Sequence, residues 1–257
     1  MKLIPVFVHR RLEHRPNLLK ILDNIGWLFI DKILRMGVGL FIGVWIARYL
    51  GPEQFGLLNF ALAITGLLGI IATLGLKSIV VRDIVRAPDC AKETLGTTAM
   101  LHVIGGMGAF LVGIVLVAYL RPDDAQARAV VAILGAINLL NVSQIAVYWF
   151  ESRVQSKYTV WVQNGVFLLF AVIKVFMILL QAPFMAFVWM MVGEAVVTAL
   201  VLLIVMGWVS LPLNSLAVKF ERAKILLSDS WPLALSSMAI MVYMKIDQIM
   251  LGQMIGD

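Results

Sequence analysis

Long runs of apolar residues alternate with short polar connections along this chain of 257 residues. About twenty apolar residues are needed to cross the roughly 30 Å hydrocarbon core of a bilayer. We therefore expect an all-α fold, a polytopic integral membrane bundle of about seven transmembrane helices. The predicted spans are residues 24–46, 56–78, 97–120, 129–150, 160–180, 184–208 and 231–252.

Composition supports the membrane class and narrows the function. Hydrophobic residues make up 61% of the chain and charged residues 14%, where a soluble domain is near half apolar and a quarter charged. The net charge of +6 does not indicate nucleic acid, because the basic residues show no stripe interleaved with aromatics. One cysteine, Cys90, excludes an intramolecular disulfide or a multi-cysteine metal site. The sequence shows no catalytic group, so we expect a non-enzymatic protein without metal or cofactor.

The basic residues between the spans predict the orientation, because short cytoplasmic loops carry an excess of Lys and Arg. The N-terminal segment and every second connection hold most of them: Lys2, Arg10, Arg11, Arg15, Lys20, Lys77, Arg82, Arg86, Lys92, Arg153, Lys157, Lys219, Arg222 and Lys224. The opposite connections hold Arg48, Arg121 and Arg128. We therefore expect the N-terminus and these basic segments to be cytoplasmic. Residues 1–23 fit a basic amphipathic helix on the membrane surface or, equally, a disordered basic tail.

The first span contains three ionisable residues, Asp31, Lys32 and Arg35. Asp31 and Arg35 are four residues apart, which places them on one helix face in the favourable order. At 1.5 Å per residue, Arg35 lies about 16 Å from Asn24, close to mid-bilayer. A basic group there can line a cavity for an anionic substrate, with Asp31 holding it in place. The alternative is an interfacial cluster whose long side chains reach back to the cytoplasmic surface.

Four further charges lie inside later spans, where a charge is costly and usually meets a partner or a polar cavity. Lys174 and Glu194 flank the short connection between the fifth and sixth spans at similar depths, so they can form a structural ion pair or a coupling site. Lys245 and Asp247 are two residues apart, so they point to nearly opposite faces of the seventh span. Embedded charges in a polytopic bundle are typical of a transporter.

Small residues recur at four-residue spacing in two spans: Gly39 and Gly43 in the first, and Gly105, Ala109 and Gly113 in the third. Such spacing lets helices approach closely in lipid. We therefore expect both stripes to pack against neighbouring helices.

One sequence motif is more specific than the rest. The run Ala47-Arg48-Tyr49-Leu50-Gly51-Pro52-Glu53-Gln54-Phe55-Gly56 predicts a helix end, a Gly-Pro break and a new helix. It resembles the first periplasmic loop of the polysaccharide flippases of the O-antigen translocase type. The runs 74–83, 95–97 and 247–252 are also similar to segments of that family, which belongs to the multidrug/oligosaccharidyl-lipid/polysaccharide exporter superfamily.

The resemblance implies a fold, a location and a substrate. Family members have about twelve to fourteen helices in two lobes, so residues 24–208 would be the six-helix first lobe. Residues 209–230 would then be a cytoplasmic connection, and 231–257 the first helix of a truncated second lobe, making the chain a piece of a longer protein. The implied function is to move an undecaprenyl-pyrophosphate-linked oligosaccharide across the bacterial inner membrane for surface polysaccharide (O-antigen, lipopolysaccharide) synthesis. Its partners would be that lipid-linked oligosaccharide, membrane lipids and other polysaccharide assembly proteins.

The same resemblance gives roles to the embedded charges. Arg35, Lys32 and Lys245 would bind the pyrophosphate, and the coupling or gating residues would be Asp31, Lys174, Glu194 and Asp247. Three alternatives stay open: a cation-coupled multidrug exporter of the same superfamily, a membrane enzyme acting on the same lipid-linked sugars, and an inactive fragment. A basic first span disfavours the exporter of cations, and the absence of a large external loop disfavours the enzyme.

Overall fold

The computed structural model describes residues 16–212 and 215–254, and within them it contains helices and no strand. Apolar helices satisfy their own backbone hydrogen bonds, which is what a bilayer demands of a spanning segment. The predicted all-α class is therefore confirmed. The elements are α2 (Pro16–Thr73), α3 (Lys77–Arg86), η1 (Pro88–Cys90), α4 (Ala91–Leu120), α5 (Ala125–Gly135), η2 (Ala136–Ser143), α6 (Gln144–Ser152), α7 (Ser156–Leu179), α8 (Phe184–Val209) and α9 (Phe220–Met254).

Helix α2 consists of two arms separated by a sharp kink. The kink is at Gly51, whose backbone angles (φ 73°, ψ 174°) are open to glycine and strained for other residues. Pro52 follows directly and, lacking an N–H, begins the next helical stretch without losing a bond. The Gly-Pro break predicted from the sequence is thus confirmed, and it turns the chain sharply between the first two spans. We call residues 16–50 the first arm and residues 52–73 the second arm.

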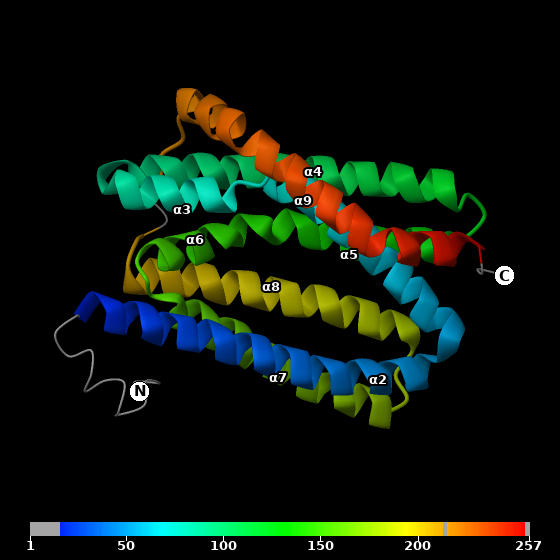
Figure 1. Cartoon of the computed structure of the whole chain (residues 1–257). Coiled ribbons are helices and arrows are strands. Elements are labelled where there is room, and N and C mark those ends of the chain that lie inside the picture. The colour runs from blue at the N-terminus through cyan, green and yellow to red at the C-terminus, as the bar shows by residue number, and fades with distance from the viewer. Residues whose placement is uncertain (1–15, 213–214, 255–257) are drawn as a thin grey trace.

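The two arms pack against different parts of the bundle (Figure 1). The first arm lies along α7, where the Asn24 side-chain oxygen accepts a 2.8 Å hydrogen bond from the backbone N–H of Ser156. The second arm lies against α4, with the backbone of Ala72 directly beneath Gly105. Helix α9 crosses over the bundle and contacts the second arm.

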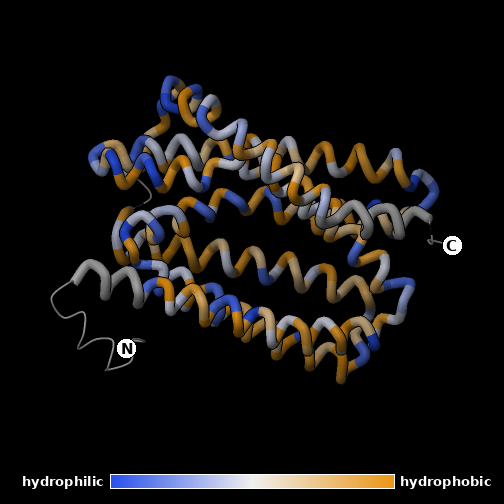
Figure 2. The backbone as a smooth tube through the Cα atoms, in the orientation of Figure 1, coloured by the Kyte–Doolittle hydropathy of each residue, from blue (hydrophilic) through white to orange (hydrophobic). Residues whose placement is uncertain are grey.

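The connections gather at two opposite ends of the bundle, as the predicted alternation of spans requires (Figure 1). At one end, the Tyr49 hydroxyl beside the kink donates a 2.8 Å hydrogen bond to the carbonyl of Ala182 in the α7–α8 turn. At the other, Lys77 of α3 and Glu151 of α6 form a 2.7 Å ion pair. Figure 2 shows hydrophilic residues concentrated at these ends and apolar residues along the helices between them.

Five described segments are long and apolar enough to cross a membrane: Asn24–Arg86, Pro88–Leu120, Ala125–Ser152, Ser156–Leu179 and Phe184–Val209. The first of them contains both arms of α2 and therefore two predicted spans. These segments hold the first six predicted spans, and α9 holds the seventh. The predicted helix number is consistent with the structure.

The second and fourth spans differ from the prediction. The second span ends at Thr73, because Leu74 (φ 52°) and Gly75 (φ 64°) both adopt left-handed backbone conformations that stop the helix. The fourth span is not one α-helix, since the 3₁₀ stretch η2 separates α5 from α6. A 3₁₀ stretch of 8 residues is unusually long, and nothing in the apolar pattern reveals it.

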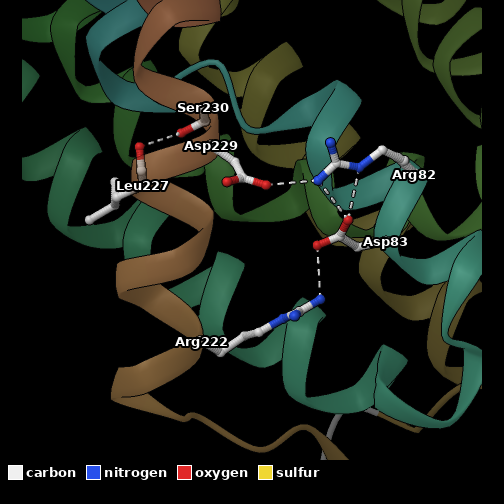
Figure 3. A network of polar contacts seen from close by, with 6 residues as sticks. All are labelled: Arg82, Asp83, Arg222, Leu227, Asp229 and Ser230. Carbon is white, nitrogen blue, oxygen red and sulfur yellow. Dashed lines mark hydrogen bonds and ion pairs between the residues drawn. The ribbon is translucent and has the colours of Figure 1, made fainter.

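The end of the bundle that carries α3 is held to α9 by an ion network (Figure 3). Asp83 of α3 accepts bonds from Arg82 at 3.0 Å and from Arg222 of α9 at 2.9 Å. Arg82 also reaches Asp229 of α9 at 2.8 Å. The bonds from Arg222 to Asp83 and from Arg82 to Asp229 join residues far apart in sequence, so they hold the start of α9 on the rest of the bundle.

The segment before α9 is attached to the start of α4 in the same way. The Lys219 ammonium lies 2.5 Å from the Glu93 carboxylate, and this hydrogen bond holds the pKa of Lys219 above its usual value. The backbone N–H of Lys219 also donates to the hydroxyl of Thr97 at 3.1 Å. The connection between α8 and α9 is therefore bound to the surface of the bundle.

Of the two predicted small-residue stripes, the one in α4 is packed. A Cβ at Gly105 would lie 2.7 Å from the carbonyl oxygen of Ala72, and Ala109 is fully buried. Gly113 also faces a neighbour, the side chain of Leu68. Gly39 and Gly43 in the first arm have no atom within 4 Å of an added Cβ, so their predicted packing is not found among the described residues.

Replacing Gly105 with alanine is expected to destabilise the protein, while the same change at Gly108 is not. An added methyl at Gly105 would collide with backbone, and overpacking of this kind costs about 1–3 kcal/mol. Gly108 has open space, so alanine there gains up to about 1 kcal/mol from helix propensity. Thermal unfolding of the two variants in detergent should move in opposite directions. Equal shifts would contradict the close α2–α4 contact.

Candidate functional site

Arg35 occupies the first arm of α2 and is held by three groups. Its Nε donates to Asp31 Oδ1 at 2.9 Å, which confirms the predicted pair one helical turn apart. Its Nη2 reaches the side-chain oxygen of Gln163 on α7 at 3.4 Å. The guanidinium also lies over the ring of Phe167, 5.6 Å from its centroid. Its Nη1 bonds to no other described residue, so one end of the fork is free to bind a ligand.

Gln163 and Phe167 are functional candidates that the sequence interpretation missed. They are four residues apart on α7, and Lys174 follows Phe167 by seven, so the three share one face of the helix. The signal available in the sequence was the polar pair Gln163-Asn164 in the fifth span, which is otherwise apolar except for Lys174. It could not show that this face of α7 meets the first arm, because that contact joins residues 128 positions apart.

Lys174 of α7 and Glu194 of α8 form the ion pair that the hairpin geometry allowed. The Lys174 Nζ lies 2.6 Å from Glu194 Oε2, and only 13% of the lysine side chain is exposed. A helical side chain leans toward the N-terminus of its helix. The Lys174 side chain therefore points away from the α7–α8 turn, toward the level along the bundle at which Glu194 lies. The close contact neutralises two charges inside the membrane-spanning part of the bundle.

The remaining predicted site residues lie elsewhere. Lys32 is exposed on the first arm and pairs with no described residue, so it is not part of the Arg35 cluster. Lys245 and Asp247 belong to the last part of α9, and their side chains lie outside the described residues. The structure thus brings Asp31 and Arg35 together, and Lys174 and Glu194 together, and leaves Lys32 apart.

Both carboxylates of these clusters are occupied. Asp31 and Glu194 are each paired with a base, so the two ion pairs together carry no net charge, and Lys32 lies apart from them. The described residues also contain no group of three His, Cys, Asp or Glu side chains able to hold a metal ion. A planar guanidinium with a free end suits phosphate groups in particular.

These observations define a polytopic helical membrane protein with basic residues inside its spans. The family model described as "Polysaccharide biosynthesis protein" matches residues 21–257. The chain belongs to this polysaccharide biosynthesis family, which confirms the resemblance drawn from its motifs. No curated protein and no solved structure matches the chain.

Proposed function

We propose that this chain forms the first lobe, and the start of the second, of a flippase for a lipid-linked oligosaccharide. The substrate would be of the undecaprenyl-pyrophosphate type, moved from the cytoplasmic to the outer leaflet of the bacterial inner membrane. The N-terminus would be cytoplasmic. The protein would act without enzymatic chemistry, alongside other proteins that assemble the polysaccharide.

The observation that carries this proposal is the position of Arg35. A diphosphate crossing a bilayer needs cationic donors at a depth where water cannot solvate it. Arg35 would supply such a donor from within the first span, and Asp31, Gln163 and Phe167 hold its orientation. A preorganised group binds more tightly, because less side-chain freedom is lost when the ligand arrives.

The same site argues against export of a cationic drug. An exporter of cations needs a carboxylate that is free to accept one. Both carboxylates described inside the spans, Asp31 and Glu194, are already paired with a base. The family and the unoccupied end of the Arg35 guanidinium together favour an anionic lipid-linked sugar.

Deletion of the gene in its own host tests the function. We expect surface polysaccharide to disappear and the lipid-linked oligosaccharide to accumulate on the cytoplasmic leaflet, where external lectins cannot bind it. Reintroduction of the complete open reading frame should restore both. Unchanged surface polysaccharide would contradict a flippase role. Loss of polysaccharide with no lipid-linked intermediate would place the protein earlier in the assembly route.

A further inference from the structure

A hollow of about 350 Å³ lies between the kink of α2 and the α7–α8 turn. Its lining residues come from these two places, which are more than a hundred positions apart in the chain: Tyr49, Gln54, Gln181, Ala182, Pro183 and Phe184. The hydrogen bond from the Tyr49 hydroxyl to the Ala182 carbonyl fixes the two sides relative to each other. Its volume lies within the range of small-molecule sites in proteins.

The lining is polar and carries no charge. The amides of Gln54 and Gln181 make no hydrogen bond with another described residue, so each offers a carbonyl acceptor and two N–H donors. Tyr49 and Phe184 complete the lining, and Phe184 is itself buried. A sugar ring carries several hydroxyl groups that both donate and accept hydrogen bonds, which suits two uncommitted amides. A phosphate would require a cation, and a metal ion would require carboxylate, His or Cys ligands, and the lining contains none of these.

The backbone at Gln181 is one where glycine would be expected. Gln181 has φ 52°, just past the end of α7. The N–H groups of Gln181 and Ala182 bond back to Ile178 and Met177, at 3.2 and 3.0 Å, which is the usual helix-ending arrangement. Glycine is the common residue at this position, because a Cβ there costs about 1 kcal/mol or more. The chain instead keeps an amide side chain, which lines the hollow. Leu74 and Val154 adopt the same conformation at other helix ends, so the amide beside the hollow is what distinguishes Gln181.

We propose that this hollow is a carbohydrate-binding site that takes one neutral sugar ring through the amides of Gln54 and Gln181. Under the orientation proposed above, it opens on the outer side of the membrane. It would receive a sugar of the transported glycan there. That biological role rests on the proposed flippase function, while sugar binding itself does not.

Saturation-transfer NMR on the full chain in detergent micelles tests the site with D-glucose, D-galactose and N-acetylglucosamine as probes. We expect transfer to at least one sugar and no competition from inorganic phosphate.

Gln181→Gly removes the amide and relaxes the backbone, so it should keep or raise the thermal stability. Gln54→Ala removes the second amide from the exposed surface of a helix. Each change should weaken sugar binding at least fivefold.

Two control variants separate the amides from general effects. Val154→Gly relaxes a matching left-handed residue (φ 56°) at the end of α6, far from the hollow in sequence and at the opposite end of the bundle. Gln126→Ala removes an exposed glutamine from the start of α5. Both should bind sugar like the parent chain.

Each outcome of the binding measurement either supports or overturns the sugar site. Loss of binding in the two glutamine variants, with binding kept in the two controls, supports the site. Absence of binding to all three sugars in the parent chain overturns it, and so does equal binding in the Gln54→Ala, Gln181→Gly double variant. Failure of the proposed function would be seen separately, because the binding measurement does not depend on flipping.

Discussion

Arg35→Ala is expected to lower export of the glycan by about ten- to a hundredfold at unchanged protein level. The substitution removes the charge-assisted bonds that Arg35 would make to the diphosphate, each worth about 1.5–3 kcal/mol. Every 1.4 kcal/mol is a factor of ten. It also leaves Asp31 without its partner, which adds a negative charge where the anion should bind. Surface polysaccharide, normalised to the amount of protein inserted in the membrane, is the measurement.

Three further variants sharpen the interpretation. Arg35→Lys keeps the charge and loses the planar fork, so we expect an intermediate loss. Gln163→Leu removes an anchor of the guanidinium and should weaken export less than Arg35→Ala. Arg48→Ala is the matched control, because it removes an exposed arginine from the same helix, away from the cluster. Normal export by an inserted Arg35→Ala protein would remove Arg35 from the substrate site.

The parts of the fold that depend on local pattern could be predicted from the sequence. Span lengths follow from bilayer thickness, and the kink follows from Gly51 and Pro52, since both constrain only their own backbone. The Asp31–Arg35 pair is set by the helical repeat alone. The Lys174–Glu194 pair was within reach because the short turn between α7 and α8 makes those helices neighbours. In each case the feature depends on residues that lie near one another in the sequence.

The parts that depend on contacts between distant segments could not be predicted. Gln163 and Phe167 join the Arg35 site only because the first arm lies on α7. The 3₁₀ stretch η2 lies inside a predicted apolar span, and its close contact with Gly106 of α4 is a tertiary feature. Likewise, the same small-residue spacing is packed around Gly105 and open around Gly39. The spacing permits close packing, but the neighbouring helix decides whether it occurs.

Lys174→Ala is expected to destabilise the bundle strongly. It would leave the Glu194 carboxylate without a counter-charge inside the spanning region, and breaking a buried ion pair from one side costs about 3–5 kcal/mol. Glu194→Ala should have a comparable effect through the unpaired lysine. The thermal unfolding midpoint in detergent and the amount of inserted protein should both fall in each single variant.

The double variant Lys174→Leu, Glu194→Leu separates a structural pair from a coupling site. Replacing both charges with apolar residues leaves no unpaired ion, and such replacements are often neutral or stabilising. We therefore expect the double variant to recover the stability that each single change loses. Because the pair is closed at 2.6 Å and joins α7 to α8, we also expect it to export glycan normally. A stable double variant that fails to export would assign Lys174 and Glu194 to coupling instead, since only their charges, and not the packing of the helices, would then be missing.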